Sequence, residues 1–479
     1  MYRESSLLDK LMEIKKKDHL PMHIPGHKRS FNVGQRLSQV LQCRIGELDF
    51  TEIPGLDDLH SPSGIIDKAQ KFAAQCFGAK ASFFLVNGCT VGIQSAIMAL
   101  CGEGDEAAVS RNLHRSIFEG LVLSGAKPLY YPISYDKEMG IPLGPRLEKV
   151  QKLFKDNSPK VFLMVHPTYY GTAADMGIIE EAHRSGAAVI VDEAHGSHFK
   201  FDPRLPPSSL EAGGDIVVHG THKTLGSLTQ TGLLHLGSGR VKPEDVKRFL
   251  SLLQTTSPSY ILMASINAMC LDLADGDLVK KAVDAALFLR EEIGKTPGFY
   301  CYEPKELYDP TKIILGHQDV GGRFLGHILR EEYGIYPELE GESFVLLMVS
   351  VGDSLKTVKK TAEALRDLST RLRQEIKESI NSYKIKKGSV YYFDELPQMI
   401  LTPREAYFYR RRRKIPLSQS CGEVCGEMIV PYPPGIPILL PGERISESIV
   451  EYLSVSINEG CHIQGLDMVK VPEIEILEC

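Results

Sequence analysis

Short apolar runs alternate with amphipathic segments over residues 61–285 of the chain. Runs of four to six apolar residues bounded by turn residues are typical of buried strands. The segments between them place apolar residues on one helical face. The expected strands are Ala81–Val86, Glu106–Ser110, Val161–Val165, Ala187–Val191, Asp215–Val218 and Leu233–Leu236, and the expected helices are Ile65–Phe77, Thr90–Leu100 and Ile117–Ser124. This alternation predicts an α/β fold with a mostly parallel sheet covered on both faces.

The pattern changes after residue 285. Two long charged helices, Val283–Ile293 and Leu355–Ser379, bracket the strand-like segments Lys312–Leu315 and Phe344–Val351, which predicts a smaller α+β domain. The proline-rich stretch 430–437 favours a rigid, irregular path in the last region. We therefore expect an N-terminal helix and arm over 1–60, a large domain over 61–285, a small α+β domain over 286–379 and a C-terminal domain over 380–479.

Composition narrows the class of protein. A length of 479 residues suggests about three domains. The net charge of −6 argues against general nucleic-acid binding, and no apolar stretch resembles a signal peptide or a membrane span. We therefore expect a cytoplasmic protein with no membrane partner. The ten cysteines show no framework spacing, and the pair Cys421 and Cys425 lacks further ligands at suitable spacing, so we expect reduced thiols and no metal site.

Two polar clusters each follow an expected strand. Asp192-Glu193-Ala194-His195-Gly196 comes after Ala187–Val191, and Thr221-His222-Lys223 comes after Asp215–Val218. Both clusters are expected at the carboxyl edge of the sheet, where open α/β folds bind ligands. A lysine that forms a Schiff base and a carboxylate that pairs with a pyridinium nitrogen are what pyridoxal phosphate (PLP) requires. Lys223 and Asp192 are our candidates, against the alternatives of a solvated lysine and a helix-capping aspartate.

Three further sites extend this hypothesis. His114 follows the strand Glu106–Ser110 and is either a ring that stacks on the cofactor or a loop histidine bonded to the backbone. Asn87-Gly88-Cys89-Thr90 opens a helix, whose free amides and dipole suit a phosphate. His195 is either a group that orients the cofactor or substrate, or a structural histidine.

Eight ordered segments carry a family resemblance. They are PGHK (25–28), DFTEIPGLDDLHSPSG (49–64), FLVNGCTVGIQ (84–94), RNLHRS (111–116), HPTYYG (166–171), DEAHGSHF (192–199), THKTLGSLTQ (221–230) and VPYPPGIPILLPGE (430–443). Together they resemble the Orn/Lys/Arg decarboxylase family, PLP enzymes of the aspartate-aminotransferase fold (fold type I). The chain is similar to the shorter, Gram-positive-type branch that includes biosynthetic arginine decarboxylases.

The resemblance implies a role for each matching residue. Lys223 would form the Schiff base, Asp192 would pair with the pyridine nitrogen, His114 would stack on the ring and His195 would lie beside the reacting group. The phosphate would be held by Cys89, Thr90, Thr221 and His222. It also implies a homodimer or higher homo-oligomer with active sites at the subunit interface.

Three positions depart from the family pattern. Cys89 and Gly220 stand where hydroxyl residues commonly contact the phosphate, and Glu423 stands where a basic residue is common. Both losses of a hydroxyl would weaken phosphate binding unless backbone amides compensate.

The resemblance implies decarboxylation of a small basic amino acid, with L-arginine, giving agmatine, as our first choice and lysine and ornithine as alternatives. Candidate acceptors for the distal cation are Glu427, Glu423, Asp57 and Asp58, and the alternative for each is a solvated or helix-capping carboxylate. A PLP aminotransferase or lyase on the same fold is a rival, with Arg404 as its clamp for the α-carboxylate. A catalytically silent paralogue is the second rival.

Overall fold

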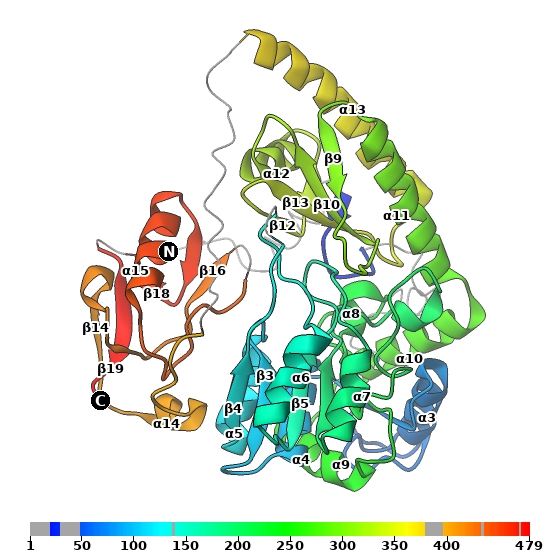
Figure 1. Ribbon diagram of the computed structural model, residues 1–479. Helices are drawn as coiled ribbons and strands as arrows, with labels where there is room; N and C mark the ends of the chain where they lie inside the picture. The colour runs from blue at the N-terminus through cyan, green and yellow to red at the C-terminus, as the bar shows by residue number, and fades with distance from the viewer. Residues whose placement is uncertain (1–19, 29–47, 137–138, 379–395, 433–434, 469–470) are drawn as a thin grey trace, which may run out of the picture.

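The chain forms three regions, each with its own sheet, in the computed structural model (Figure 1). The described residues are 20–28, 48–136, 139–378, 396–432, 435–468 and 471–479. The helix expected at the start of the chain lies outside these residues. The large region has a hydrophobic core on each face of its sheet, and the small and C-terminal regions each have a core of their own. The domain boundaries expected from the sequence stay a prediction.

The large region is built on a seven-stranded sheet. Its strand order is β2 (Ala81–Leu85), β8 (Gly232–Leu236), β7 (Ile216–His219), β6 (Ala188–Asp192), β5 (Val161–Val165), β3 (Glu106–Ser110) and β4 (Lys127–Tyr131). β8 runs antiparallel to both of its neighbours, and every other adjacent pair is parallel. The expectation of a mostly parallel sheet is confirmed.

Helices cover both faces of this sheet. One face packs against α3 (Ile65–Phe77), α6 (Leu147–Asp156), α7 (Gly177–Arg184) and α10 (Tyr260–Asp275), and the other against α4 (Gly88–Leu100), α5 (Arg115–Ser124) and α9 (Pro243–Leu253). Along β6, Val189 and Val191 enter the first core and Ile190 enters the second. Because a central strand is buried on both faces, it carries an unbroken apolar run rather than an alternating one.

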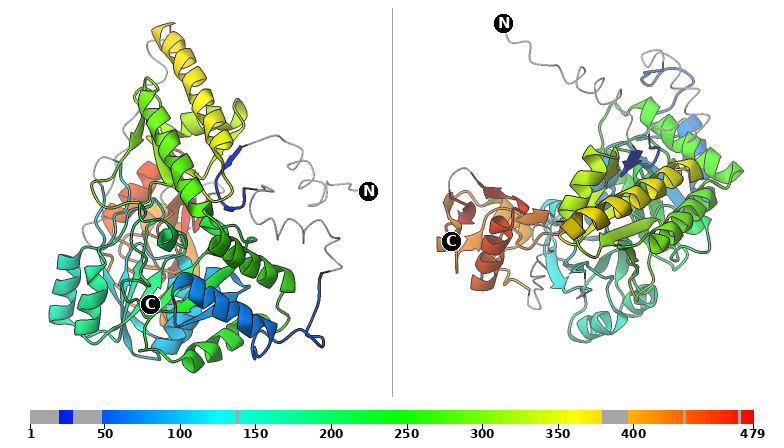
Figure 2. Two further views of the ribbon diagram at one scale, coloured as in Figure 1. Left: turned by 90° about the vertical axis from the view of Figure 1, so that its right-hand side faces the viewer. Right: turned by 90° about the horizontal axis from the view of Figure 1, so that it is seen from above.

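The small region has a four-stranded antiparallel sheet. Its strand order is β12 (Leu339–Glu340), β13 (Phe344–Met348), β10 (Lys312–His317) and β9 (Phe299–Tyr302). The helices that pack against this sheet are α11 (Leu278–Lys295), α12 (Gly322–Glu331) and α13 (Leu355–Glu378). α11 and α13 lie side by side (Figures 1 and 2). α11 joins two cores, since Val283 packs in the large region and Leu289 in the small one. Within the described ranges, no helix combines the length and apolarity that crossing a membrane requires.

An N-terminal arm, residues 20–28, lies between the small region and the segment that carries Lys223 (Figure 1). Its strand β1 (Leu20–Met22) pairs in parallel with β11 (Ile335–Pro337). The amide of Gly26 donates to the carbonyl of His222 over 2.8 Å. Two segments that are remote in sequence are therefore joined through the backbone.

The C-terminal region stands to one side of the large sheet (Figure 2). It contains β14 (Arg412–Pro416), β15 (Val424–Cys425), β16 (Val430–Tyr432), β17 (His462–Gln464), β18 (Leu466–Asp467), β19 (Glu473–Leu477), α14 (Pro403–Phe408) and α15 (Glu447–Asn458). The buried Arg111, which follows β3, donates to the carbonyls of Pro437 and Ile438 over 2.8 and 3.1 Å, and its guanidinium lies 2.9 Å from Glu443. The proline-rich stretch thus presents fixed carbonyls to a buried arginine.

Removing the Arg111 guanidinium should loosen the attachment of the C-terminal region. Burial raises the pKa of Glu443, and the nearby Arg111 opposes this shift. Arg111→Met would leave Glu443 buried without its cation, so we expect a loss of about 3–5 kcal/mol in the free energy of unfolding. Urea unfolding followed by circular dichroism measures this loss, because the chain contains no tryptophan.

Arg184→Met is the matched control. Arg184 is exposed and pairs with Glu181 on the surface of α7, so its removal should cost less than about 1 kcal/mol. Equal losses in the two variants would contradict the role assigned to Arg111.

Candidate active site

Asp192 and Lys223 lie at the same edge of the large sheet. β6 ends at Asp192, which pairs in register with Val218 of β7, and Lys223 follows in the short helix α8 (Thr221–Thr224). Asp192 is buried, and its Oδ1 accepts a hydrogen bond from the amide of Ala194 over 3.2 Å. The parallel pairing of β6 and β7 is what brings the acid and the lysine together.

His195 lies between two lysines. Its Nε2 is 3.1 Å from Nζ of Lys223, and its Nδ1 is 3.0 Å from Nζ of Lys312. The ring of Tyr169 packs edge-on against it, with 5.0 Å between the ring centroids. Burial and then the charges of Lys223 and Lys312 hold the pKa of His195 well below its ordinary value. The imidazole is therefore neutral and has amine partners at both nitrogens.

Glu193, the neighbour of Asp192, faces a different set of partners. Its carboxylate accepts hydrogen bonds from Nε2 of His219 over 3.1 Å and from the amide of Ser209 over 2.9 Å. Burial alone raises the pKa of Glu193, but the hydrogen bond and charge of His219 and further donors outweigh it, so the pKa lies below its ordinary value. Of the two adjacent acids, Glu193 is paired within the core, which leaves Asp192 as the candidate acid of the site.

His114 caps α5 and also faces the site. Its Nδ1 accepts from the amide of Ser116 over 3.2 Å, and the residue lines a cavity of about 660 Å³ between the large and C-terminal regions. Desolvation is the largest cause that lowers the pKa of His114; Asp192 opposes it and Lys223 adds to it. The backbone-bonded alternative for His114 is confirmed, and stacking on a cofactor ring stays a prediction.

The first turn of α4 lies at the same edge of the large sheet and offers backbone amides. Gly88 has a φ of 77°, and the amides of Cys89 and Thr90 are in the first turn, where a helix provides no internal acceptors. Burial raises the pKa of the Cys89 thiol to about 12, with smaller effects from Lys223 and Asp192, so this side chain is an uncharged neighbour of both. The first turn therefore provides backbone donors of the kind that bind phosphate.

The residues present fit PLP. Asp192 can pair with a pyridinium nitrogen, Lys223 can form a Schiff base and His114 can meet the ring face. The amides of Cys89 and Thr90 can hold the phosphate without the hydroxyl that the family pattern places at residue 89. Nδ1 of His222 donates to the carbonyl of Thr231 over 2.7 Å, which leaves its Nε2 for a ligand.

Two positions considered for the phosphate have close contacts of their own within the chain. Thr221 is fully buried, and its hydroxyl lies 2.7 Å from that of Ser227 and 3.2 Å from that of Thr231, so it supports the lysine segment from within. At Gly220, a Cβ atom would lie 2.6 Å from the carbonyl oxygen of Ala194. A serine at residue 220 would therefore be crowded by the backbone of this chain.

Asp57 and Asp58 serve the backbone. The carboxylate of Asp57 accepts from the amides of Ser63, Gly64 and Ile66 over 2.7–2.9 Å at the start of α3. Burial raises the pKa of Asp57, but these amides together lower it below its ordinary value. Asp58 accepts from the amide of His60 over 2.8 Å. Within this chain, the helix-cap alternative describes Asp57, whereas Asp58 closes a turn with His60.

The candidate residues of the C-terminal region, Glu427, Glu423 and Arg404, occupy different places. Glu427 lines the same cavity as His114, whereas Glu423 is not among the residues that line it. Arg404 donates to the carbonyls of Val122, over 2.8 Å, and Leu123 at the end of α5. This arginine closes a helix C-terminus, so the structure does not place it as a clamp for a substrate carboxylate.

Residues of the small region and the arm were missed from sequence. Lys312, the first residue of β10, reaches His195 although it lies far along the chain. Tyr169 and Lys28 belong to segments quoted for the family resemblance, but nothing in their spacing indicated a contact with the site. The one signal for Lys312 is a charged residue at the start of a buried apolar run.

A side chain at residue 220 should disturb the lysine segment. Gly220→Ser would push its Cβ into the Ala194 carbonyl, so we expect a loss of about 1–3 kcal/mol in the free energy of unfolding. Gly294→Ser, in α11, meets no atom within 4 Å and is the control, with an expected change below about 1 kcal/mol. If Gly220→Ser unfolds at the wild-type urea concentration, the close backbone approach is refuted.

The matching family models cover most of the chain. They are "Orn/Lys/Arg decarboxylase, major domain" over residues 5–315 and "Orn/Lys/Arg decarboxylase, C-terminal domain" over residues 387–468. An arginine decarboxylase of Bacillus subtilis (strain 168) is 36% identical and aligns with 96% of this chain and 95% of its own length.

Solved structures agree on the fold. The lysine decarboxylase LdcF of Francisella novicida has a TM-score of 0.78 at 19% identity, covering 99% of this chain and 84% of its own. An alanine–glyoxylate aminotransferase of Nostoc sp. has a TM-score of 0.58 at 16% identity, covering 74% and 95%. The fold is therefore that of the PLP fold-type I enzymes expected from the sequence. On the family models and the full-length similarity, the chain belongs to the Orn/Lys/Arg decarboxylase family.

Proposed function

We propose that this protein catalyses the PLP-dependent decarboxylation of a basic amino acid, with L-arginine as substrate and agmatine and CO2 as products. The observation that carries the proposal is the contact between Lys223 and the neutral His195 at the sheet edge that also holds Asp192. The similarity to a B. subtilis arginine decarboxylase supports arginine over the other basic amino acids.

Each residue of the site would have a separate task. Lys223 would bind the cofactor covalently, Asp192 would keep its pyridine nitrogen protonated and the first turn of α4 would hold its phosphate. When bound, PLP supplies a sink for the electrons that remain when the carboxylate leaves. His195, held neutral between two lysines, carries one ring proton that it can present beside Lys223.

The position of Arg404 favours decarboxylation over transamination. An aminotransferase retains the α-carboxylate and binds it with a cation, whereas a decarboxylase must let this group leave. The candidate clamp from the sequence, Arg404, is bonded to the end of α5. Arg404 is therefore already bonded elsewhere, and the aminotransferase alternative lacks its candidate residue for binding the α-carboxylate.

The cavity beside His114 suits a cationic side chain. Its acidic residues are Glu427, Asp467, Glu473 and Glu475. Lys414 lies 3.0 Å from Asp467 and Arg412 lies 2.7 Å from Glu475, so these two carboxylates are paired with cations. Glu427 is the acceptor we propose for the guanidinium of arginine, because a carboxylate matches its planar fork.

We further propose that the enzyme acts in the cytoplasm as a homodimer or higher homo-oligomer. A shallow apolar hollow of about 270 Å³ is lined by Phe50 and Ile65, which are 44% and 55% exposed. Contiguous exposed apolar surface is characteristic of protein–protein contacts. A second copy of the chain is the partner that the family resemblance implies.

The proposal predicts a product from a single amino acid. Purified, PLP-loaded protein should release CO2 and agmatine from arginine, and much less amine from lysine or ornithine. Lys223→Ala should abolish the reaction because it removes the Schiff-base amine. Product analysis by mass spectrometry tests this, and a keto acid in place of the amine would establish the aminotransferase instead.

A second prediction concerns recognition of the substrate. Glu427→Gln keeps the size of the side chain but removes the charge, so the KM for arginine should rise about tenfold or more, with a smaller change in kcat. Glu423→Gln, outside the cavity, should leave the KM within about twofold. Equal effects of both variants would exclude Glu427 as the acceptor.

A further inference from the structure

Lys312 is a buried lysine for which the proposed function has no task. It is 1% exposed at the start of β10, with Nζ 3.0 Å from Nδ1 of His195 and 3.3 Å from Sδ of Met348. Its Nζ also lies 5.5 Å from the centroid of the Tyr169 ring. Burying an ammonium is costly unless polar partners compensate, so the contact with His195 calls for a physical explanation.

The hydrogen-bonding capacity of the two groups determines where the proton of His195 lies. An ammonium has only donors, and a neutral imidazole has one donor and one acceptor nitrogen. While Lys223 is a free ammonium, it competes with Lys312 for the single acceptor nitrogen of the ring. Once Lys223 is bound to the cofactor, Lys312 donates to Nδ1, so Nδ1 is the acceptor and the ring proton is on Nε2. Nε2 faces Lys223 at 3.1 Å, at the edge where the cofactor would bind.

The charges around Lys312 allow it to release a proton near neutral pH. Burial lowers the pKa of Lys312 to about 8. The charged or titratable groups that face it are Glu338 and Asp309, which raise this pKa, Lys223 and Lys28, which lower it, and the neighbouring His195 and Tyr169. Lys312 is thus charged below about pH 8 and neutral above it.

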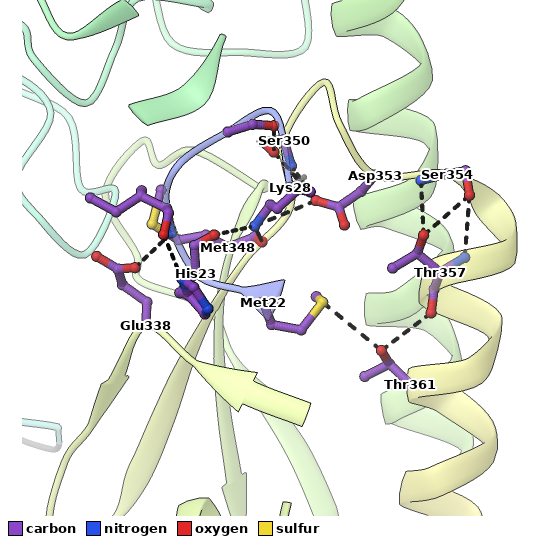
Figure 3. Close-up of polar contacts among 12 residues, drawn as sticks. Met22, His23, Lys28, Glu338, Met348, Ser350, Asp353, Ser354, Thr357 and Thr361 are labelled. Carbon is purple, nitrogen blue, oxygen red and sulfur yellow. Dashed lines mark hydrogen bonds and ion pairs between the residues drawn. The ribbon is translucent and has the colours of Figure 1, made fainter. Parts of the chain in front are cut away.

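The N-terminal arm lies against Glu338 (Figure 3), and Glu338 connects it to Tyr169. The hydroxyl of Tyr169 donates to one carboxylate oxygen of Glu338 over 2.6 Å, and the amide of Ile24 donates to the other over 2.9 Å. Because Tyr169 packs against His195, the arm fixes one side of the imidazole. Lys312 fixes the other side.

We propose that Lys312 is a positioning residue that keeps the proton of His195 on Nε2 and resupplies it during each turnover. The inference rests on the proposed decarboxylation. The bond between Cα and the carboxyl carbon breaks, CO2 leaves, and the proton on Nε2 moves to Cα to form the new C–H bond. Lys312 donates a proton to Nδ1, so the ring remains neutral. Nε2 then takes a proton from solvent and Nδ1 returns its proton to Lys312, so each turnover consumes one solvent proton.

Nuclear magnetic resonance of the cofactor-free Lys223→Met protein, with ¹⁵N-labelled histidine, tests the proton position without any turnover and without a second ammonium beside Nε2. With Lys312 intact, this protein should show His195 protonated on Nε2 below about pH 8 and a change as Lys312 titrates. Lys312→Met should abolish this change and mix the two tautomers. If the ring nitrogens of His195 respond to pH alike in both proteins, the proposal is overturned, whether or not the enzyme decarboxylates arginine.

Lys28→Met is the matched control for loss of a buried lysine. Lys28 is 8% exposed and donates to the carbonyls of His23 and Met348 over 2.7 and 2.8 Å (Figure 3). Its charge lowers the pKa of Lys312, so its removal should move the titration of Lys312 to higher pH without abolishing it. Loss of the Nε2 tautomer in Lys28→Met as well would show a general structural effect and overturn the proposal.

Kinetics of the PLP-loaded enzyme give a second test. With arginine, kcat should fall as the pH rises through about 8, because neutral Lys312 no longer donates. Lys312→Met should lower kcat by about 10²-fold, remove this pH dependence and leave the KM nearly unchanged, and Lys312→Arg should restore part of kcat. A raised KM at unchanged kcat would instead make Lys312 a binder of the substrate carboxylate and overturn the proposal.

The two experiments distinguish failure of the proposed function from failure of the role proposed for Lys312. If the wild type releases no amine or CO2, the proposed function fails, and the nuclear magnetic resonance result alone decides the tautomer role of Lys312. If Lys312→Met does not fold by circular dichroism, Lys312→Gln replaces it in both experiments.

Discussion

Close backbone approach around the lysine segment is the constraint on which the site depends. A Cβ atom at Gly26 would lie 2.5 Å from the carbonyl oxygen of Leu225, and one at Gly220 would lie 2.6 Å from that of Ala194. The arm therefore lies directly against the end of α8, and the segment after β6 lies directly against its start, with no room for side chains between them. These two contacts hold the segment that carries Lys223 close to the segment that carries His195, and they leave little space for a side chain at residue 220.

Burial and pairing with neighbours, rather than the number of charged residues, determine which groups of the site are available and which are neutral. Asp192 and Glu193 are adjacent in sequence, yet Glu193 is satisfied by His219 within the core and Asp192 is left for the sheet edge. A neutral His195 separates two lysines that would otherwise repel each other at close range. Such a group can transfer a proton without creating a new buried charge.

The site draws on every region of the chain. The large sheet carries the candidate acid and lysine, the small region carries Lys312, and the C-terminal region lines, with Glu427, the cavity that His114 borders. Arg111 ties the C-terminal region to the end of β3, only a few residues before His114. The loop after β3 therefore both attaches the C-terminal region, through Arg111, and positions His114, a candidate cofactor contact.

The sequence by itself determined the mostly parallel sheet, the edge that carries Asp192 and Lys223, and the family. Local periodicity and strand-end positions suffice for these, because both are properties of short segments. Only the tertiary structure decided that Lys312 reaches His195, that Asp57 caps a helix and that Arg404 closes another one. These contacts join residues whose separation is set by packing between regions, and packing of that kind leaves no periodic trace along the chain.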